Sequence, residues 1–113
     1  MSLRAQGLRT WLLQRLSAVY MAIYSLVAIS WLSINPPLDF PTWQAVFAHP
    51  LTNMFTQLFI FLLLAHAWVG VRDIFVDYVH HAPTRFILLL LVSTMQLMLA
   101  IWSFMALYSV VQL

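Results

Sequence analysis

Residues 86–111 have the sequence FILLLLVSTMQLMLAIWSFMALYSVV and contain no Asp, Glu, Lys, Arg or His. An α-helix crosses the hydrocarbon core of a bilayer with about 20 apolar residues, and every backbone polar group is then paired inside the helix. Two further apolar stretches of comparable length, residues 16–34 and 52–71, precede this one. The sequence therefore predicts an all-α integral membrane protein with three transmembrane helices.

The composition supports a membrane protein and excludes several other classes. Of the 113 residues, 64% are hydrophobic and 7% are charged, which leaves too little polar surface for a water-soluble globule. The absence of cysteine excludes disulfides, iron–sulfur ligation and thiolate metal sites within the chain. The net charge of +2 comes from a few arginines near the span ends, so no nucleic-acid partner is expected.

Prolines and polar residues indicate where the helices begin and end. Pro36 and Pro37 should stop the first helix, because proline lacks an amide donor and disfavours helical geometry in the preceding residue. Thr52 or Asn53 is expected to cap the second helix, and Pro83 suits the first turn of the third. The expected elements of this single domain, 1–113, are helices at about 16–34, 52–75 and 84–112 and an interfacial segment at about 41–48.

The distribution of arginine predicts the topology. Arg4, Arg9 and Arg15 precede the first span, and Arg72 and Arg85 flank the link between the second and third spans. The other link and the C-terminal end contain no Lys or Arg. The positive-inside rule therefore places the N-terminus in the cytoplasm and the C-terminus outside. The first apolar stretch lacks a small-residue cleavage pattern, so we expect the N-terminus to be retained.

His66 is the one histidine inside a predicted span. Ionisable groups in hydrocarbon are costly, which makes them candidates for function. His66 comes about 14 residues into the second helix, or roughly 21 Å along its axis, and so lies toward the cytoplasmic side. Its imidazole could ligate haem iron or could hydrogen-bond a neighbouring helix, and position alone favours neither interpretation.

Gly70 and two aspartates share a helical stripe with His66. At Gly70 the missing side chain would admit a flat macrocycle or allow close helix packing, and packing is the simpler interpretation. In a continuous helix Asp73 and Asp77 continue this stripe, with Asp77 about 16 Å nearer the cytoplasm than His66. They indicate a proton-coupled site at the interface, or solvated charges at a helix end.

Tyr78 and Arg15 each allow two interpretations. The Tyr78 hydroxyl could donate to a quinone carbonyl, although tyrosine is also common in the interfacial belt. Arg15 could pair with haem propionates or lipid phosphates, or it could extend its charge to the membrane surface. Links contain His49, His80 and His81. Adjacent histidines point in different directions, so we expect no metal site there.

Residues 66–79, HAWVGVRDIFVDYV, resemble the second-helix signature of the hydrophobic membrane anchor subunit of succinate dehydrogenase. The chain resembles the smaller of the two anchor polypeptides in that enzyme. The signature is His-Ala-Trp, then Gly, then Asp-Tyr at this spacing. Helix number, chain length and expected topology extend the resemblance over essentially the whole chain, mainly as a pattern outside this segment.

The resemblance implies a role for each matching residue. His66 would be one axial ligand of haem b, with Gly70 in the haem pocket. Tyr78 would hydrogen-bond a quinone carbonyl, with Asp77 beside it. Arg15 resembles the family's first-helix arginine near the haem propionates.

One feature of the family's first helix is missing. The family often has a histidine shortly before the arginine that Arg15 resembles, and here that region offers Arg9 and Trp11. The match around Arg15, within the segment QRLS at 14–17, is therefore looser than the match around His66.

The resemblance also implies a heteromeric helix bundle in the bacterial cytoplasmic (inner) membrane. A haem with two histidine ligands needs a second histidine, so the larger anchor subunit must supply it. The chain would dock the iron–sulfur and flavoprotein subunits, contact membrane lipids, and help ubiquinone to receive electrons from succinate. It would have no dicarboxylate or flavin site and would not be an enzyme by itself.

Three alternatives remain on the sequence alone. The chain could anchor a fumarate reductase that runs the reverse electron flow. It could be a stand-alone cytochrome, although such a protein would normally carry both haem ligands. It could also be a small non-redox membrane protein.

Overall fold

The computed structural model describes residues 3–35 and 39–113, with side chains from residue 7 onward. This part of the chain forms α1 (Leu3–Ile34), α2 (Phe40–Ala48), α3 (Pro50–Tyr78) and α4 (Ala82–Val110), and it contains no strand. Three helices are long and apolar enough to cross a membrane, over Gly7–Ile34, Pro50–Tyr78 and Ala82–Val110. The all-α, three-span prediction is therefore confirmed.

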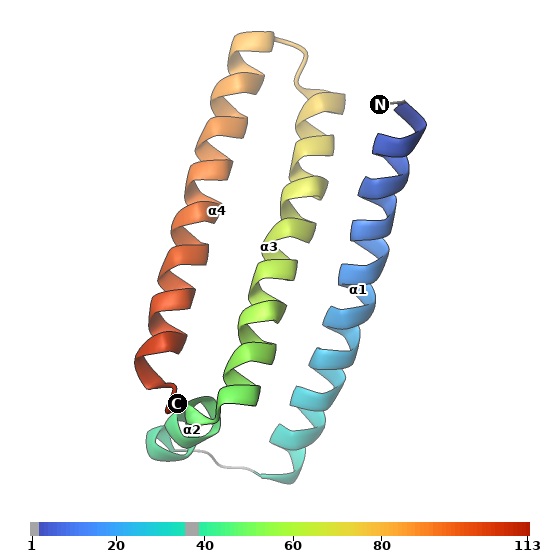
Figure 1. The fold of residues 1–113 in the computed structure, drawn as a ribbon. Helices are drawn as coiled ribbons and strands as arrows, with labels where there is room; N and C mark the ends of the chain where they lie inside the picture. Colours follow the sequence, from blue (N-terminus) through green and yellow to red (C-terminus); the bar gives the residue numbers. More distant parts are fainter. Residues whose placement is uncertain (1–2, 36–38) are drawn as a thin grey trace.

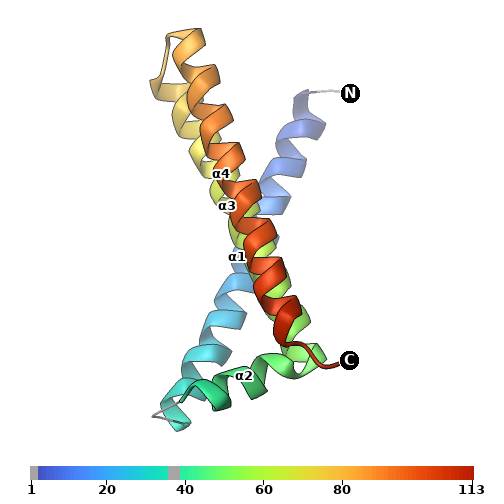
Figure 2. The ribbon, with the colours of Figure 1, turned by 90° about the vertical axis from the view of Figure 1, so that its left-hand side faces the viewer.

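The three long helices form one layer with α3 in the middle (Figure 1). Within the described residues α3 contacts both α1 and α4, whereas α1 and α4 do not contact each other. In Figure 2, α1 crosses the α3–α4 pair at a marked angle. The short helix α2 lies across one end, and the N-terminus lies at the opposite end, with the link between α3 and α4.

The helix bounds differ from the expected ones mainly at the start of α1. This helix begins at Leu3 rather than near residue 16, because its polar first turns contain no proline and the backbone ladder continues through them. α3 likewise continues to Tyr78 without a break. The expected interfacial segment at 41–48 corresponds to α2. Pro36 and Pro37 lie outside the described residues, and α1 ends at Ile34 shortly before them.

The start of α3 corrects the prediction that Thr52 or Asn53 caps this helix. His49 is the cap, and its Nδ1 accepts a hydrogen bond from the backbone N–H of Leu51 at 3.2 Å. Pro50 occupies the first turn, where its fixed φ suits a helix and its missing N–H leaves no donor unpaired. The helix consequently begins earlier than expected, which releases Asn53 to face the interior.

Asn53 joins three helices at the α2 end of the layer. Its side chain is 2% exposed. Nδ2 donates to the carbonyl of Phe47 on α2 at 2.9 Å and to the carbonyl of Leu107 on α4 at 2.7 Å. Oδ1 accepts from Nε2 of Gln57 at 2.8 Å. Such interhelical hydrogen bonds contribute to packing where lipid supplies no hydrophobic driving force between helices.

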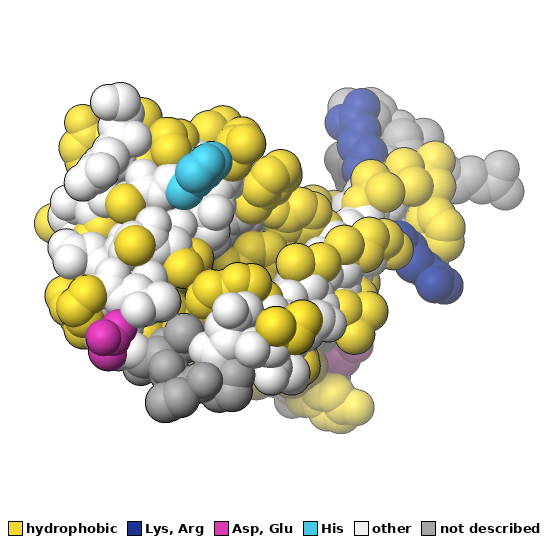
Figure 3. Space-filling view, turned by 90° about the horizontal axis from the view of Figure 1, so that it is seen from below, with side chains coloured by type: hydrophobic (Ala, Val, Ile, Leu, Met, Phe, Trp, Pro, Cys, Tyr) yellow, Lys and Arg dark blue, Asp and Glu magenta, His cyan; other side chains and the backbone are white. Residues whose placement is uncertain are grey.

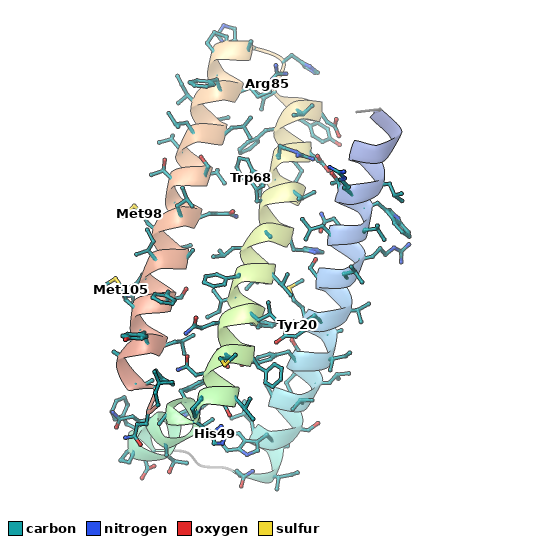
Figure 4. All side chains as sticks on the ribbon, in the orientation of Figure 1. Tyr20, His49, Trp68, Arg85, Met98 and Met105 are labelled. Carbon is teal, nitrogen blue, oxygen red and sulfur yellow. The ribbon has the colours of Figure 1, made fainter. Side chains whose placement is uncertain are left out.

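Tyrosines on α1 connect it to α3. The Tyr20 hydroxyl donates to the carbonyl of Phe55 at 2.8 Å, and the hydroxyls of Tyr24 and Thr56 are 2.7 Å apart. The Tyr24 ring also stacks on Phe59 with centroids 4.3 Å apart. Figure 4 shows Tyr20 between the two helices. These contacts fix the rotation of α1 about its axis and so decide which of its side chains face α3.

Most of the apolar surface of the layer is uncovered. Val69 is the one hydrophobic residue buried among the described side chains, and no residue of α4 is buried. Met98 and Met105 project from the side of α4 that faces away from α3 (Figure 4). Such a surface needs lipid or the helices of partner subunits around it.

Basic residues are confined to one end of the layer. They lie in the first half of α1, near the end of α3 and near the start of α4, at Arg4, Arg9, Arg15, Arg72 and Arg85. The end that carries α2 and the C-terminus contains no Lys or Arg. Seen from that end, the near surface is mostly hydrophobic or uncharged, with basic side chains only farther off (Figure 3). The uneven distribution of arginine along the sequence therefore places the basic residues at one end of the folded chain.

Candidate functional site

The central contact of the site joins His66 on α3 to Ser17 on α1. Nδ1 of His66 and Oγ of Ser17 are 3.0 Å apart. Ser17 is 1% exposed, whereas His66 is only partly buried by this chain. One ring nitrogen of His66 is therefore held inside the α1–α3 interface.

The two contacts of Ser17 are compatible with a proton on Nδ1 of His66. Ser17 Oγ donates its single proton to the carbonyl of Gln14, one turn earlier in α1, at 3.1 Å. The oxygen can then only accept at Nδ1, so the contact is satisfied when Nδ1–H of His66 donates to Oγ. In this tautomer Nε2 of His66 carries the free lone pair, which is the atom that a metal ion would use.

Gly70 lies one turn after His66 and faces open space. A Cβ added there would meet no heavy atom of the described residues within 4 Å. Close packing within this chain, the simpler explanation for this glycine, is therefore not seen. The space beside Gly70 is available to a partner helix or to a flat group bound next to His66.

A cleft between α1 and α3 begins one turn nearer the arginine end than the Ser17–His66 contact. Its volume is about 570 Å³. Gln14 is one of its lining residues, and Oε1 of Gln14 is buried with no hydrogen-bond partner among the described residues. Arg72 and Asp73 form an ion pair at 3.2 Å at this cleft. The lining residues are Gly7, Thr10, Trp11, Gln14, Val69, Arg72 and Asp73.

Arg15 does not share the Ser17 face of α1. Arg15 is two positions before Ser17, which rotates it by about 200° from Ser17 around the helix. Its guanidinium carbon lies 5.3 Å from the centroid of the Trp11 ring, a cation–π arrangement on an exposed side of α1. An anion that meets Arg15 has to approach that side of α1, so this chain alone does not bring Arg15 together with His66.

Asp77 and Tyr78 occupy the last turn of α3. Because α3 is continuous, Asp77 follows His66 on the same stripe, about 16 Å farther along the axis. Both side chains are exposed, and Tyr78 is 77% exposed. No cavity found among the described residues encloses them. The described part of this chain alone does not form a pocket around these two residues.

The other histidines lie at or beyond the helix ends. His49 caps α3, and His81 Nδ1 lies 2.8 Å from Oγ1 of Thr84 at the start of α4. His80 is exposed in the link before it. No cluster of three His, Cys, Asp or Glu side chains that could hold a metal ion occurs in residues 3–35 and 39–113.

Sequence reasoning did not identify Ser17 or Gln14 as site residues. A serine in an apolar helix is commonplace, and only the rotation of α1 against α3 makes Ser17 a neighbour of His66. The available signal was weak, since Ser17 is one of several hydroxyl residues in the first span.

Comparisons with known proteins identify the family of this chain. Residues 3–102 match the family model described as succinate dehydrogenase/fumarate reductase transmembrane subunit. The succinate dehydrogenase hydrophobic membrane anchor subunit of Coxiella burnetii (strain RSA 493 / Nine Mile phase I) is 37% identical over 98 residues, which cover 87% of this chain and 85% of that protein. The chain therefore belongs to the succinate dehydrogenase/fumarate reductase transmembrane subunit family.

Proposed function

We propose that this chain is the smaller membrane anchor of a succinate:quinone oxidoreductase. In this role it docks the iron–sulfur and flavoprotein subunits to the membrane and contributes His66 to a haem b site and Asp77 and Tyr78 to a quinone site. Family membership supports the anchor role. The Ser17–His66 contact is the observation that carries the haem assignment.

The donor chemistry at His66 fits haem b. Haem iron takes a neutral imidazole through one nitrogen, while the other nitrogen usually donates to a neighbouring acceptor. Ser17 is such an acceptor for Nδ1–H, which leaves Nε2 for the iron. When bound, haem b supplies a one-electron redox centre. The chain's own contribution is to hold the imidazole in the ligating tautomer.

The space beside Gly70 is consistent with a flat ligand. Gly70 shares the His66 face, and no described atom of this chain would contact a Cβ there. A macrocycle edge bound at His66 could therefore lie against the α3 backbone. In this proposal Arg15 can pair with a haem propionate only if the propionate reaches the exposed side of α1.

A second histidine ligand for a haem held by His66 would come from another subunit. Outside His66, the histidines of this chain lie at helix ends and in a link, far from the middle of a span. The larger anchor polypeptide is the natural source of the other histidine, because the open faces of the layer need partner helices. The haem would then lie between the two anchors.

Tyr78 and Asp77 contribute to the quinone site from the end of α3. The Tyr78 hydroxyl can donate to a quinone carbonyl, and Asp77 can hold a proton near it or orient a nearby arginine. Their exposure in this chain is consistent with a site completed by the larger anchor and the iron–sulfur subunit. The substrate in this proposal is ubiquinone.

The arginine end of the layer faces the bacterial cytoplasm in this proposal, and the α2 end faces outward. Arg4, Arg9, Arg15, Arg72 and Arg85 all lie at that end. The docked subunits would then bind on the cytoplasmic side, next to Tyr78. The layer's exposed apolar sides contact membrane lipids where no partner helix covers them.

A fumarate reductase anchor is the second candidate, because the family model covers both enzymes. The relative from Coxiella burnetii is named for succinate dehydrogenase, and this favours succinate oxidation.

The test of the haem assignment is His66→Ala in the assembled complex. We expect the low-spin haem signal of the reduced-minus-oxidised spectrum to disappear or shift. Co-purification of all four subunits shows that the complex is assembled. His80→Ala is the matched control, because it removes a histidine from the link and should leave the spectrum unchanged. An assembled His66→Ala complex with the wild-type spectrum would exclude His66 as a ligand.

A further inference from the structure

Ser17 differs from the other serines of the spans in what its hydroxyl contacts. The hydroxyls of Ser33, Ser93 and Ser103 donate to a carbonyl of their own helix. Such a bond satisfies the single hydroxyl proton. Ser17 makes this bond too, to Gln14, and it additionally contacts a side chain on another helix, Nδ1 of His66.

The two contacts of Ser17 act together. The carbonyl of Gln14 takes the hydroxyl proton, so Oγ presents a lone pair to His66. Ser17 is 1% exposed, and water does not compete for that lone pair. When Nε2 binds haem iron, the imidazole proton is on Nδ1, and Ser17 Oγ at 3.0 Å is the acceptor that this chain offers to it.

We propose that Ser17 is the positioning residue for His66: its oxygen fixes the tautomer and orientation of the imidazole and thereby sets the redox potential of the bound haem. This inference rests on the proposed function, in which His66 ligates haem b. Ser17 does not touch the haem in this proposal, and it acts only through Nδ1–H of His66.

The effect on the potential follows from the hydrogen bond. An acceptor at Nδ1–H increases the electron density of the imidazole and makes Nε2 a more basic ligand. A more basic ligand favours the oxidised, more positively charged iron over the reduced iron. Removing the acceptor should therefore raise the midpoint potential and weaken retention of the haem.

The test compares Ser17→Ala, Ser17→Thr and Ser33→Ala in the intact complex. Ser17→Ala removes one oxygen and little volume. Ser17→Thr restores a hydroxyl at the same position. Ser33→Ala is the matched control, because Ser33 is on the same helix and, among the described residues, its hydroxyl bonds only to the carbonyl of Ile29. The measurements are a potentiometric titration of the haem spectrum and transfer of haem to apomyoglobin.

We expect Ser17→Ala to raise the midpoint potential and to weaken haem retention by roughly 10- to 100-fold, the range typical of residues that support a metal ligand. Ser17→Thr should return both values toward wild type, and Ser33→Ala should leave both unchanged. If the threonine variant does not assemble, the comparison of the two alanine variants decides.

A wild-type potential and wild-type haem retention in Ser17→Ala would overturn the inference. Equal shifts in Ser17→Ala and Ser33→Ala would also overturn it, because they would indicate a general effect on α1. The proposed function is tested separately: if His66→Ala retains the haem signal, the ligand assignment fails. If His66→Ala loses the signal while Ser17→Ala is unchanged, only the positioning role fails.

Discussion

Asn53 on α3 donates to the backbone carbonyl of Leu107 on α4 at 2.7 Å, and the same nitrogen donates to the carbonyl of Phe47 on α2. One buried amide thus satisfies two carbonyls on two other helices. The α2 end of the layer is therefore held by polar contacts, whereas the faces of the layer are apolar and largely exposed.

Asn53→Ala should destabilise the anchor by about 1–3 kcal/mol, the usual cost of leaving buried polar groups without partners. Hydrogen bonds between membrane helices average about 0.6 kcal/mol, so the lower part of the range is the expected one. Thermal unfolding of the detergent-solubilised complex, followed by tryptophan fluorescence, measures the effect. The Asn53→Leu variant should lose a similar amount of stability. Leucine keeps the side-chain volume but makes no hydrogen bond, so this variant separates loss of the hydrogen bonds from loss of volume.

Gln57→Ala is the control for this prediction. Gln57 contributes only one hydrogen bond to the cluster, to Oδ1 of Asn53. Its loss should cost less than the loss of Asn53. A larger effect of Gln57→Ala would contradict the central position of Asn53.

The fold could be predicted from the sequence because a bilayer leaves few alternatives. Residues 86–111 contain no charged side chain, and a backbone in hydrocarbon must pair its polar groups within a helix or a closed barrel. The helix ends were harder to predict. The sequence favours Thr52 or Asn53 as the cap of α3, but Pro50 starts the helix earlier and His49 supplies the acceptor.

Only part of the candidate site could be predicted from the sequence. His66 was identifiable because an ionisable side chain within a span is unusual. Ser17 was not, because its contact with His66 depends on the rotation of α1, which Tyr20 and Tyr24 fix from several turns away. A pattern within one helix cannot report the register between two helices.

Reporter fusions test the orientation of the layer. Because Arg9, Arg15, Arg72 and Arg85 lie at one end, we expect the opposite end to face the periplasm. Alkaline phosphatase fused after Leu113 or inserted in the link between α1 and α2 should be active. The same enzyme inserted at the link between α3 and α4 should be inactive. A cytoplasmic signal at Leu113 would contradict the proposed topology.

Gly70→Leu should lower the haem content of the complex, because the new side chain would occupy the space beside His66. The chain itself has no described atom within 4 Å of a Cβ at Gly70, so its own packing should tolerate the change. Helix propensity should even favour Gly70→Ala by about 0.5–1 kcal/mol. Haem per complex, measured spectroscopically against protein concentration, gives the result.

Gly7→Leu is the matched control, since Gly7 also has no described neighbour within 4 Å of a Cβ but lies far along α1 from His66. It should keep a full complement of haem. Equal haem loss in both variants would indicate an assembly defect rather than a blocked pocket.

The cap of α2 should make this helix sensitive to acid. Asp39 accepts hydrogen bonds from the side chain and the backbone N–H of Thr42, and these bonds lower the pKa of its carboxyl below the ordinary value of 3.8. The carboxylate therefore stabilises α2 fully above pH 3.8. This stability is lost as the pH falls through the lowered pKa, because the unfolded state takes up the proton first.

Hydrogen exchange of the α2 amides, corrected for the intrinsic pH dependence of exchange, measures this effect. Protection in the wild type should fall below pH 3.8, the ordinary pKa of the Asp39 carboxyl. Asp39→Asn keeps a good helix cap without a titrating group, so its protection should not change over this range. A similar acid-induced loss in Asp39→Asn would place the titrating group elsewhere.

The Tyr78 hydroxyl can be removed from the proposed quinone site by deleting a single oxygen atom, as in Tyr78→Phe. A quinone carbonyl becomes more basic as it gains electrons, so a donor beside it stabilises the reduced form and the transition state more than the oxidised form. Tyr78 is 77% exposed at the end of α3, and its ring contributes little to the packing of this chain. Tyr78→Phe should therefore leave assembly intact.

We expect Tyr78→Phe to lower quinone reduction by about 10- to 1,000-fold, which corresponds to a loss of roughly 1.4–4 kcal/mol of transition-state stabilisation. Succinate oxidation with an artificial acceptor that takes electrons before the quinone should continue at the wild-type rate. Tyr108→Phe is the control, because Tyr108 is an exposed tyrosine on α4 near the opposite end of the layer. Equal loss of both activities in Tyr78→Phe would indicate faulty assembly, because a missing donor affects only the quinone step. Full quinone reduction would contradict the proposed role and leave Tyr78 as an interfacial tyrosine.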